Sequence, residues 1–351
     1  MVHFALIQIA KKHTEILGTF IEIILKNNWD LTIFYNVDAD EYNFVNFYSN
    51  LFSKQITIKN TSQIIMEADN IDFFIYGSST DDRRMPDIFK NTDLALRTIY
   101  VHHQAEHLKS YMLKSITVSP VIKSNDLQAS IYECILPIYK SYKKLHWKPE
   151  KDKKTTIFAV IGGIRTLSNG KLFDKNLELV FELLNNHPDG DYEFWFFMRK
   201  WDWIWICKKY KILENHPKIL GFPGLKTEIM IKSLHRAKFI LPLAKKKGWF
   251  YWQRLTGTIP LAINLNIPMI MDRELAEIYR MENYSLCYEN SLLEIYDKVI
   301  EMKDDDYYKW VENSVKYKAK ICKENEKKLI SLCLKQVSPN IRKNYPQISS
   351  N

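Results

Sequence analysis

A short run of small and basic residues in the second half of the chain has the composition of an anion-binding site. Thr256, Gly257 and Thr258 stand at the predicted start of a helix, shortly after the cations Lys247 and Arg254. A helix start presents backbone N–H groups and the positive end of the helix dipole, and glycine lets an anion approach closely. The pattern predicts a site for a diphosphate; a threonine that only caps the helix is the alternative interpretation.

Histidines follow two predicted strands in the first half of the chain. His13 lies in the turn after the first strand, and His102 and His103 end the strand predicted over residues 98–102. Histidine is the side chain most often used as a general base near neutral pH, so these three are candidate catalytic residues. A histidine at a strand end can also be purely structural, and that alternative stays open.

Other residue types that bind metals give weaker signals. Asp38-Ala39-Asp40 has the Asp-x-Asp form of some metal–nucleotide sites, but two acidic residues after a strand are common by chance. The five cysteines form no CxxC pair and are odd in number, which is typical of buried thiols in a reducing compartment rather than of a zinc site or disulfides. We therefore predict no metal site and a cytoplasmic protein.

Alternating strand-like and helix-like segments surround these candidates. In the first half, apolar strands are predicted over 2–10, 30–36, 55–59, 71–77, 98–102 and 115–119. In the second half, strands are predicted over 155–161, 192–198, 218–221, 238–243, 267–271 and 285–289, with helices over 174–186, 201–213, 226–236, 257–265 and 291–302. Strands that are apolar throughout and alternate with helices indicate parallel, doubly wound α/β sheets.

The domain organisation follows from one break in this pattern. Residues 141–156 are polar, rich in lysine and contain Pro149, as expected for a linker. We predict a first Rossmann-like domain over 1–148, a second over 149–304, and a C-terminal segment over 305–351 whose helix (305–335) returns to the first domain. Ligands are expected in the cleft between the two domains, at the carboxyl ends of the strands.

The stretch 155–302 resembles the donor-binding half of glycosyltransferases of the GT-B architecture, with a donor domain similar to family 4. The resemblance implies that a glycine turn meets the nucleobase and that the helix start at 256–258 meets the donor phosphates and ribose. It also implies that cations after Gly163 neutralise the leaving diphosphate. The turn is Gly221-Phe222-Pro223-Gly224, and the cations are Arg165 and Lys171.

The activity implied by this resemblance is a metal-independent glycosyl transfer from a nucleotide-diphosphate-sugar to a glycan or another hydroxyl acceptor, with no bound cofactor. Gln253 and Leu261 stand where many retaining members carry two glutamates, so the donor sugar and the stereochemistry stay open. The alternative is a non-enzymatic glycan- or nucleic-acid-binding protein on the same scaffold. Neither half carries G-x-G-x-x-G after its first strand, which argues against a dinucleotide oxidoreductase.

The bulk composition limits the partners. With 46% hydrophobic and 26% charged residues the chain is globular, and its formal charge of +9 favours an anionic partner. No zinc finger, helix-turn-helix or aromatic sheet motif indicates nucleic acid, so we predict none as a partner. No apolar run reaches the ~20 residues that span a bilayer, although peripheral contact with a membrane stays open.

Tryptophans are unusually frequent in two places. Trp195 lies in a predicted strand and Trp201, Trp203 and Trp205 follow it; we interpret these four as core packing. The aromatic run 249–252 lies beside lysines in a predicted loop, where rings could stack on a sugar or base.

Overall fold

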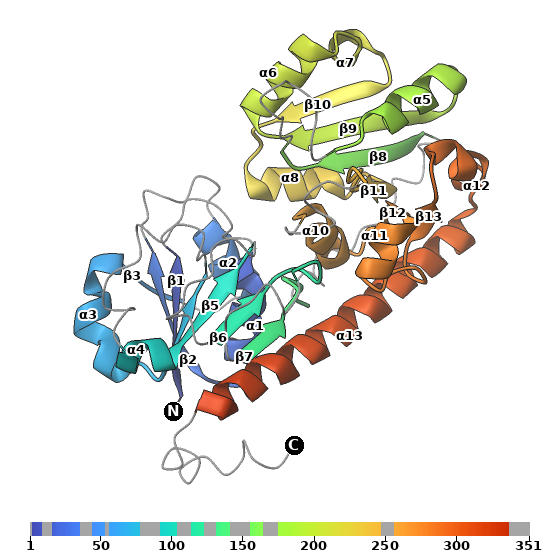
Figure 1. Cartoon of the computed structure of the whole chain (residues 1–351). Helices are drawn as coiled ribbons and strands as arrows, with labels where there is room; N and C mark the ends of the chain where they lie inside the picture. Colours follow the sequence, from blue (N-terminus) through green and yellow to red (C-terminus); the bar gives the residue numbers. More distant parts are fainter. Residues whose placement is uncertain are drawn as a thin grey trace. The chain divides into compact units, whose positions relative to one another are not determined.

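The computed structural model describes residues 2–8, 16–35, 44–52, 56–77, 92–103, 114–122, 131–140, 155–163, 175–246 and 256–336. The chain divides into two compact units, each with its own sheet (Figure 1). Unit 1 comprises Met1–Ser141, Gln253–Leu255 and Lys320–Asn351, and unit 2 comprises Tyr142–Trp252 and Thr256–Ala319.

Unit 1 is built on a seven-stranded parallel sheet in the order β3-β2-β1-β4-β5-β6-β7. Its strands are β1 (His3–Gln8), β2 (Asp30–Tyr35), β3 (Thr57–Lys59), β4 (Phe73–Tyr76), β5 (Thr98–His102), β6 (Lys114–Thr117) and β7 (Ile131–Cys134). Its helices include α1 (Leu17–Lys26), α2 (Phe44–Phe52), α3 (Ile64–Glu67) and α4 (Thr92–Arg97). The strand order reverses between β1 and β4, and sheets of this kind bind ligands at the carboxyl ends of the strands at such a reversal.

Burial on both faces explains why β1 is apolar throughout. Phe4, Ala5, Leu6 and Ile7 are all fully buried, although successive side chains of a strand point to opposite faces. A strand covered on both sides needs apolar residues at every position, which is the pattern of a parallel sheet between two layers of helices.

Unit 2 repeats this plan with a second parallel sheet. β8 (Thr156–Ile161), β9 (Tyr192–Met198), β10 (Ile219–Pro223) and β11 (Phe239–Leu241) pair in the order β10-β9-β8-β11, and β12 (Ile270–Asp272) pairs with β13 (Leu286–Tyr288). A parallel bridge between Ile240 and Met269 joins the two sheets. Numbered by their order in the chain, the six strands of unit 2 lie side by side in the order 3-2-1-4-5-6. This is the strand order of a Rossmann-like domain.

Apart from the long C-terminal helix, the described α-helices of unit 2 lie between these strands in the chain, except one that follows the last strand. They are α5 (Glu178–Asn186), α6 (Lys200–Lys209), α7 (Ile212–Asn215), α8 (Thr227–Leu234), α10 (Thr258–Leu265), α11 (Arg273–Ile278) and α12 (Tyr296–Ile300). Helix α10 ends where Asn266 adopts a left-handed conformation (φ 56°) and the N–H of Ile267 donates to the carbonyl of Ala262 at 3.1 Å. This closure satisfies carbonyls at the end of the helix before Pro268, which cannot continue it.

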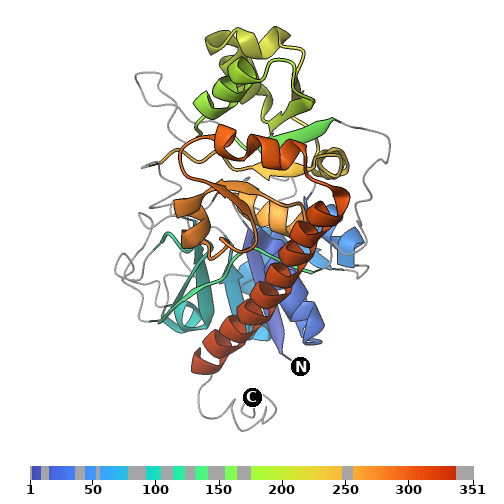
Figure 2. The ribbon, with the colours of Figure 1, turned by 90° about the vertical axis from the view of Figure 1, so that its right-hand side faces the viewer.

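Helix α13 (Asp304–Gln336) is one continuous helix, as the turned view also shows (Figure 2), and it confirms the helix predicted over 305–335. Within unit 2, the Tyr317 hydroxyl donates to the carbonyl of Tyr279 at 2.6 Å and Lys318 Nζ donates to that of Asn264 at 2.7 Å. Within unit 1, Asn325 Nδ2 donates to the carbonyl of Leu136 at 2.7 Å. Buried polar groups on both sections of the helix are thus hydrogen-bonded within their own unit.

The tryptophan prediction is confirmed for three residues and wrong for one. Trp195 is buried, and Trp203 and Trp205 pack partly buried against the core of unit 2. Trp201, by contrast, is 79% exposed on the outer side of α6. Trp201 lies one turn from Ile204, which is also exposed, on the side of α6 that faces away from the core.

His235 is a half-buried ionisable group at the end of α8, and both of its ring nitrogens are buried. Within the described part of the chain neither of its ring nitrogens has a hydrogen-bond partner, and burial lowers its pKa. The unfolded chain therefore takes up a proton on this ring at a higher pH than the folded chain does. The neutral ring contributes its full stability above the unfolded pKa of about 6.5, and that contribution is lost as the pH falls below it.

We expect His235→Leu to reduce the acid sensitivity of folding. Between about pH 7.5 and about pH 5.5, the wild-type chain should lose on the order of 1 kcal/mol more stability than the variant does. Urea unfolding at the two pH values measures the difference. Equal losses in both proteins would mean that His235 does not titrate on unfolding in this range.

Candidate functional site

The start of α10 lies against the carboxyl end of β8. Thr258 Oγ1 donates to the carbonyl of Ile161, the last residue of β8, at 2.9 Å, and Thr256 and Thr258 are both buried. Gly257 is exposed, no side chain caps the first turn, and a Cβ at Gly257 would meet no atom within 4 Å. The Thr258 hydroxyl therefore holds the helix against the strand. An anion at the start of the helix would contact the exposed backbone around Gly257.

Glycines at the end of β8 keep the neighbouring surface open. Gly162 has a φ of +99°, which favours glycine, and its Cβ position lies 3.7 Å from Thr258 Oγ1. A Cβ on Gly163 would lie 2.9 Å from Asp202 Oδ2 and 3.1 Å from Arg199 Nη2. Gly162 is therefore favoured by its backbone angle, and Gly163 by the closeness of the Arg199 and Asp202 side chains.

Arg199 is a cation at this edge that the sequence analysis missed. It follows β9 directly, and its Nε donates to Asp202 Oδ2 at 2.8 Å while Nη2 donates to Oδ1 at 3.1 Å. About half of the Arg199 side chain stays exposed. The sequence could have indicated Arg199 as a site residue, since it comes immediately after a predicted strand of seven residues. The carboxyl ends of parallel strands share one edge of the sheet, where ligands bind.

The turn after β10 reaches the same edge through its last residue. Gly224 has a φ of +67°, its N–H donates to the carbonyl of Met198 at 2.8 Å, and its Cβ position lies 3.7 Å from Lys200 Cβ. Pro223 is exposed, whereas the Phe222 ring stacks on Phe197 at 4.8 Å between centroids. We call Gly162, Gly163, Gly224 and Gly257 the glycine edge of unit 2.

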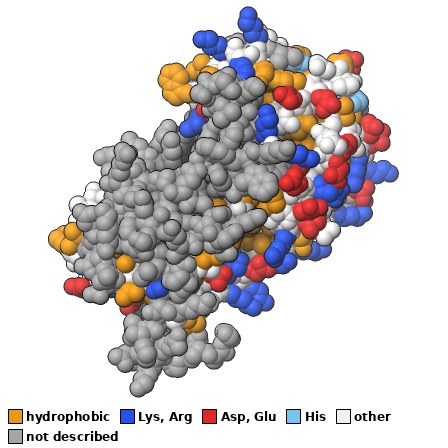
Figure 3. All heavy atoms as spheres, viewed as in Figure 1, with side chains coloured by type: hydrophobic (Ala, Val, Ile, Leu, Met, Phe, Trp, Pro, Cys, Tyr) orange, Lys and Arg blue, Asp and Glu red, His pale blue; other side chains and the backbone are white. Residues whose placement is uncertain are grey.

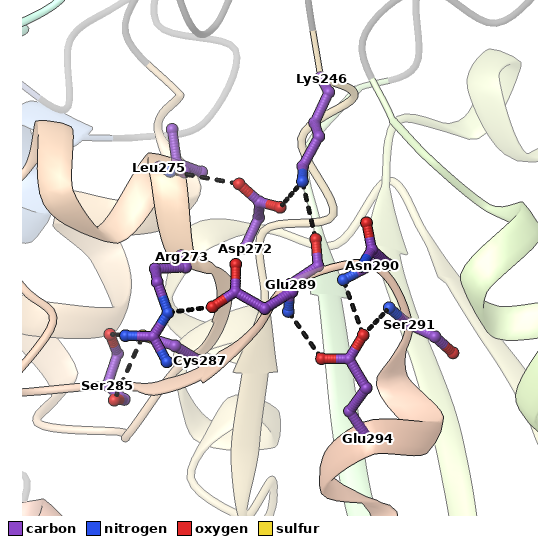
Figure 4. Close-up of polar contacts among 10 residues, drawn as sticks. All are labelled: Lys246, Asp272, Arg273, Leu275, Ser285, Cys287, Glu289, Asn290, Ser291 and Glu294. Atoms are coloured by element: carbon purple, nitrogen blue, oxygen red, sulfur yellow. Dashed lines mark hydrogen bonds and ion pairs between the residues drawn. The ribbon is translucent and has the colours of Figure 1, made fainter.

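A charged network joins the carboxyl ends of β12 and β13 (Figure 4). Asp272 is buried; its Oδ1 accepts from the N–H of Leu275 at 3.3 Å, and its Oδ2 pairs with Lys246 Nζ at 3.0 Å. Lys246 Nζ also donates to the carbonyl of Glu289 at 2.7 Å. The N–H groups of Glu289 and its two successors donate to Glu294, which holds the pKa of that carboxyl below its usual range.

We expect Lys246→Met to destabilise unit 2 by about 1–2 kcal/mol, because it leaves the buried Asp272 carboxylate without its cation. The loss is modest because the lysine is half exposed and solvent screens the ion pair. Urea unfolding followed by tryptophan fluorescence measures the loss. Lys245→Met is the matched control and should change little. The double variant Lys246→Met/Asp272→Asn should recover most of the loss; if it does not, the ion pair is not the cause.

The histidines at the end of β5 have different surroundings in unit 1. His102 has no exposed surface, and its Nε2 lies 2.9 Å from Ser115 Oγ on the neighbouring strand β6. His103 is 6% exposed, and its Nε2 lies 3.3 Å from the carbonyl oxygen of Gly77. A carbonyl only accepts, so Nε2 carries the proton in this contact and Nδ1 is the basic nitrogen of the neutral ring.

Gly77 brings His103 to the reversal point of the sheet. The Gly77 N–H donates to the carbonyl of Ile7 at 2.8 Å, and a Cβ on Gly77 would lie 2.6 Å from Gln8 Oε1. The ends of β1, β4 and β5 thus place Gln8, Gly77 and His103 together. This is the edge at which a doubly wound sheet binds its ligand.

Several predicted residues lie outside the described residues. They are His13, Arg165, Lys171, Lys247 and Arg254, together with Asp38, Asp40 and the aromatic run 249–252. Within the described ranges no three histidine, cysteine or acidic side chains come together as a metal site. None of the helices in those ranges has both the length and the hydropathy needed to cross a membrane.

One pocket of about 350 Å³ lies in unit 1 away from these edges. It is lined by residues of the second half of α1, by Phe52 and Lys140, and by residues of α13 including Glu326. Helix α1 runs from the carboxyl end of β1 back to the start of β2, so its last residues lie toward the opposite edge of the sheet. We therefore do not place the functional site in this pocket.

Comparison with known proteins gives a fold and no family. No protein-family model and no curated protein sequence match the chain. An alpha-glucosyltransferase in complex with UDP and DNA has a TM-score of 0.63 and 12% identity, with 95% of this chain and 100% of that chain covered. HepE from Anabaena, in complex with UDP and glucose, has a TM-score of 0.58 and 11% identity, with 96% and 100% covered.

A third structure, the DNA-modifying enzyme beta-glucosyltransferase, has a TM-score of 0.56 and 13% identity, with 95% and 99% covered. Two of these three descriptions name DNA, so the expectation that nucleic acid is not a partner has no support from these neighbours. The similarity to a donor domain of family 4 stays a prediction. Almost the whole chain nevertheless follows these structures, and the predicted fold is confirmed: it is the GT-B architecture, with two Rossmann-like, doubly wound α/β units.

Proposed function

We propose that the chain is a glycosyltransferase that takes a nucleotide-diphosphate-sugar as donor and a hydroxyl group of a glycan or glycoconjugate as acceptor. The observation that carries the proposal is the uncapped start of α10, where exposed Gly257 stands beside the carboxyl end of β8. The fold supports it, because the similar structures include an alpha-glucosyltransferase in complex with UDP and a beta-glucosyltransferase whose substrate is uridine diphosphoglucose.

The donor is assigned to the glycine edge of unit 2. We assign the backbone around Gly257 and the positive end of the α10 dipole to the diphosphate, together with the cations that the sequence predicts for it, Arg165, Lys171, Lys247 and Arg254. The turn 221–224 is assigned to the nucleobase. We add Arg199 to this set, since it lies within contact distance of Gly163 and keeps about half of its side chain exposed.

The reaction needs little beyond charge stabilisation and one base. The bond between the anomeric carbon and the diphosphate oxygen breaks, the acceptor oxygen bonds to that carbon, and a base takes the acceptor proton. A helix start and cationic side chains stabilise the departing diphosphate, so the proposal assigns no metal ion and no cofactor to this step. His103 and His13 are the candidate bases, and of the strand-end pair we prefer His103 because His102 has no exposed surface.

The five cysteines, all free thiols, support our assignment of the protein to the cytoplasm.

Thermal unfolding with a panel of ligands tests the proposal. A nucleoside diphosphate at about one hundred times its Kd should stabilise the folded chain by about 3 kcal/mol, whereas NAD should give no shift. A screen of nucleotide sugars for slow donor hydrolysis then names the sugar without knowledge of the acceptor. Salt-sensitive binding of an oligonucleotide without any shift by a nucleotide would contradict the transferase and favour a nucleic-acid-binding protein.

A further inference from the structure

Helix α6 carries apolar side chains on both of its sides. Its inner side packs on unit 2 through buried Ile206 and Cys207 and through Trp203, whose ring lies 5.9 Å from that of Phe196. Its outer side carries Trp201, which is 79% exposed, and Ile204, which is 47% exposed. A surface helix usually carries polar residues on its outer side, so two large apolar residues one turn apart there form a small exposed apolar patch.

Lysines surround these two apolar residues. The segment Arg199–Lys211 contains five basic residues and one acidic residue, and Asp202, the acidic one, is already paired with Arg199. In the space-filling view, hydrophobic atoms project beside Lys and Arg atoms at the end of unit 2 where α6 lies (Figure 3). We define the α6 face by its exposed members, Lys200, Trp201, Ile204, Lys208, Lys209 and Lys211.

Helical geometry groups the residues of α6 in this set on one side of the helix, and Lys211 follows two residues after the helix ends. Positions three and four apart in a helix are neighbours, which places Trp201, Ile204 and Lys208 along one stripe. Lys209 lies beside it, with its ammonium 5.1 Å from the centre of the Trp205 ring. The α6 face therefore has a small apolar centre with cationic sides, and the headgroup region of an anionic bilayer accommodates both kinds of side chain.

We propose that the α6 face binds the surface of an anionic phospholipid bilayer. Indole and aliphatic side chains enter the headgroup region, and lysine stems reach along it while their ammonium groups contact lipid phosphates. A nucleic acid offers phosphates for the lysines but no apolar phase for Ile204. A protein partner would favour an apolar centre without the surrounding lysines, because lysine is depleted in protein interfaces.

The contact is shallow and reversible. Helix α6 has ten residues, and two side chains insert, so the binding depends on both the apolar pair and the negative charge of the lipid. Binding should therefore weaken with salt and be small on neutral vesicles. This inference does not depend on the proposed glycosyl transfer, since it uses only the outer side of α6.

Vesicle sedimentation with the full chain tests the inference. Vesicles that contain phosphatidylglycerol in phosphatidylcholine should retain the protein, and pure phosphatidylcholine should retain little. The variant Trp201→Ser/Ile204→Ser should bind the anionic vesicles about tenfold more weakly, and Lys208→Glu should weaken binding in the same direction. Ile229→Ser is the matched control, because Ile229 is 50% exposed on α8, and it should bind like the wild type.

Three results would overturn the inference. They are wild-type binding by the Trp201→Ser/Ile204→Ser variant, equal binding to neutral and anionic vesicles, and tighter binding of the α6 face to a DNA or RNA oligonucleotide than to the vesicles. Melting curves of each variant show whether unit 2 stays folded. Because both substituted side chains are exposed, the melting temperature should not change.

Discussion

Gly257→Asp should abolish nucleotide binding and leave the fold intact. Gly257 has ordinary helical angles (φ −60°, ψ −18°), and a side chain added there meets no atom within 4 Å. A carboxylate in the first turn of a helix also interacts favourably with the helix dipole, so the variant should melt at or above the wild-type temperature. Its carboxylate, however, would occupy the position that we assign to the donor diphosphate.

The size of this effect follows from charge repulsion. Two like charges about 4 Å apart repel by about 4 kcal/mol at an effective dielectric constant of about 20, which predicts at least about a hundredfold weaker binding. Isothermal titration with UDP and the other nucleoside diphosphates measures it.

Gly257→Asn is the matched control for this prediction. Asparagine has the size of aspartate without its charge, so the difference between the two variants isolates the electrostatic contribution. We expect the asparagine variant to lose no more than about tenfold in affinity. If the aspartate variant binds nucleotide like the wild type, the start of α10 is not the diphosphate site, and the donor has to be sought at another strand end.

The strands and the long helix could be predicted because their signals are local. The apolar run 192–198 became β9 with the same bounds, and the helix expected over 257–265 became α10 one residue shorter at its start. Strand β7, by contrast, has only the four residues Ile131–Cys134, one of them a glutamate, and was not predicted. A short edge strand is defined by its pairing with β6 rather than by its own composition.

The polar contacts of the site could not be predicted because they are long-range. Arg199 meets Gly163 only because β8 and β9 pair in parallel with Ile161 opposite Phe197. The sequence analysis placed Thr258 at an anion, whereas its hydroxyl donates to a carbonyl almost one hundred residues earlier in the chain. Nor does the sequence show that Lys246, the neighbour of the predicted cation Lys247, pairs with the buried Asp272.

His103→Ala should remove most of the transfer activity without affecting donor binding. General base catalysis contributes about a hundredfold to ten-thousandfold to a rate, and a loss in that range is expected in acceptor-dependent turnover. The substitution lies in unit 1, at the edge formed by Gln8 and Gly77, so the affinity for nucleotide should stay at the wild-type value. Turnover and UDP titration on the same preparations separate the two quantities.

The neighbouring histidine provides the control. His102 is as close in sequence but fully buried, with its Nε2 2.9 Å from Ser115 Oγ, so His102→Gln should lower the melting temperature more than the turnover of the folded protein. A base at Nδ1 of His103 also requires the hydrogen bond from Nε2 to Gly77, because that bond fixes which nitrogen is protonated. Full turnover in His103→Ala would transfer the role to His13, and full turnover in both alanine variants would exclude a histidine base.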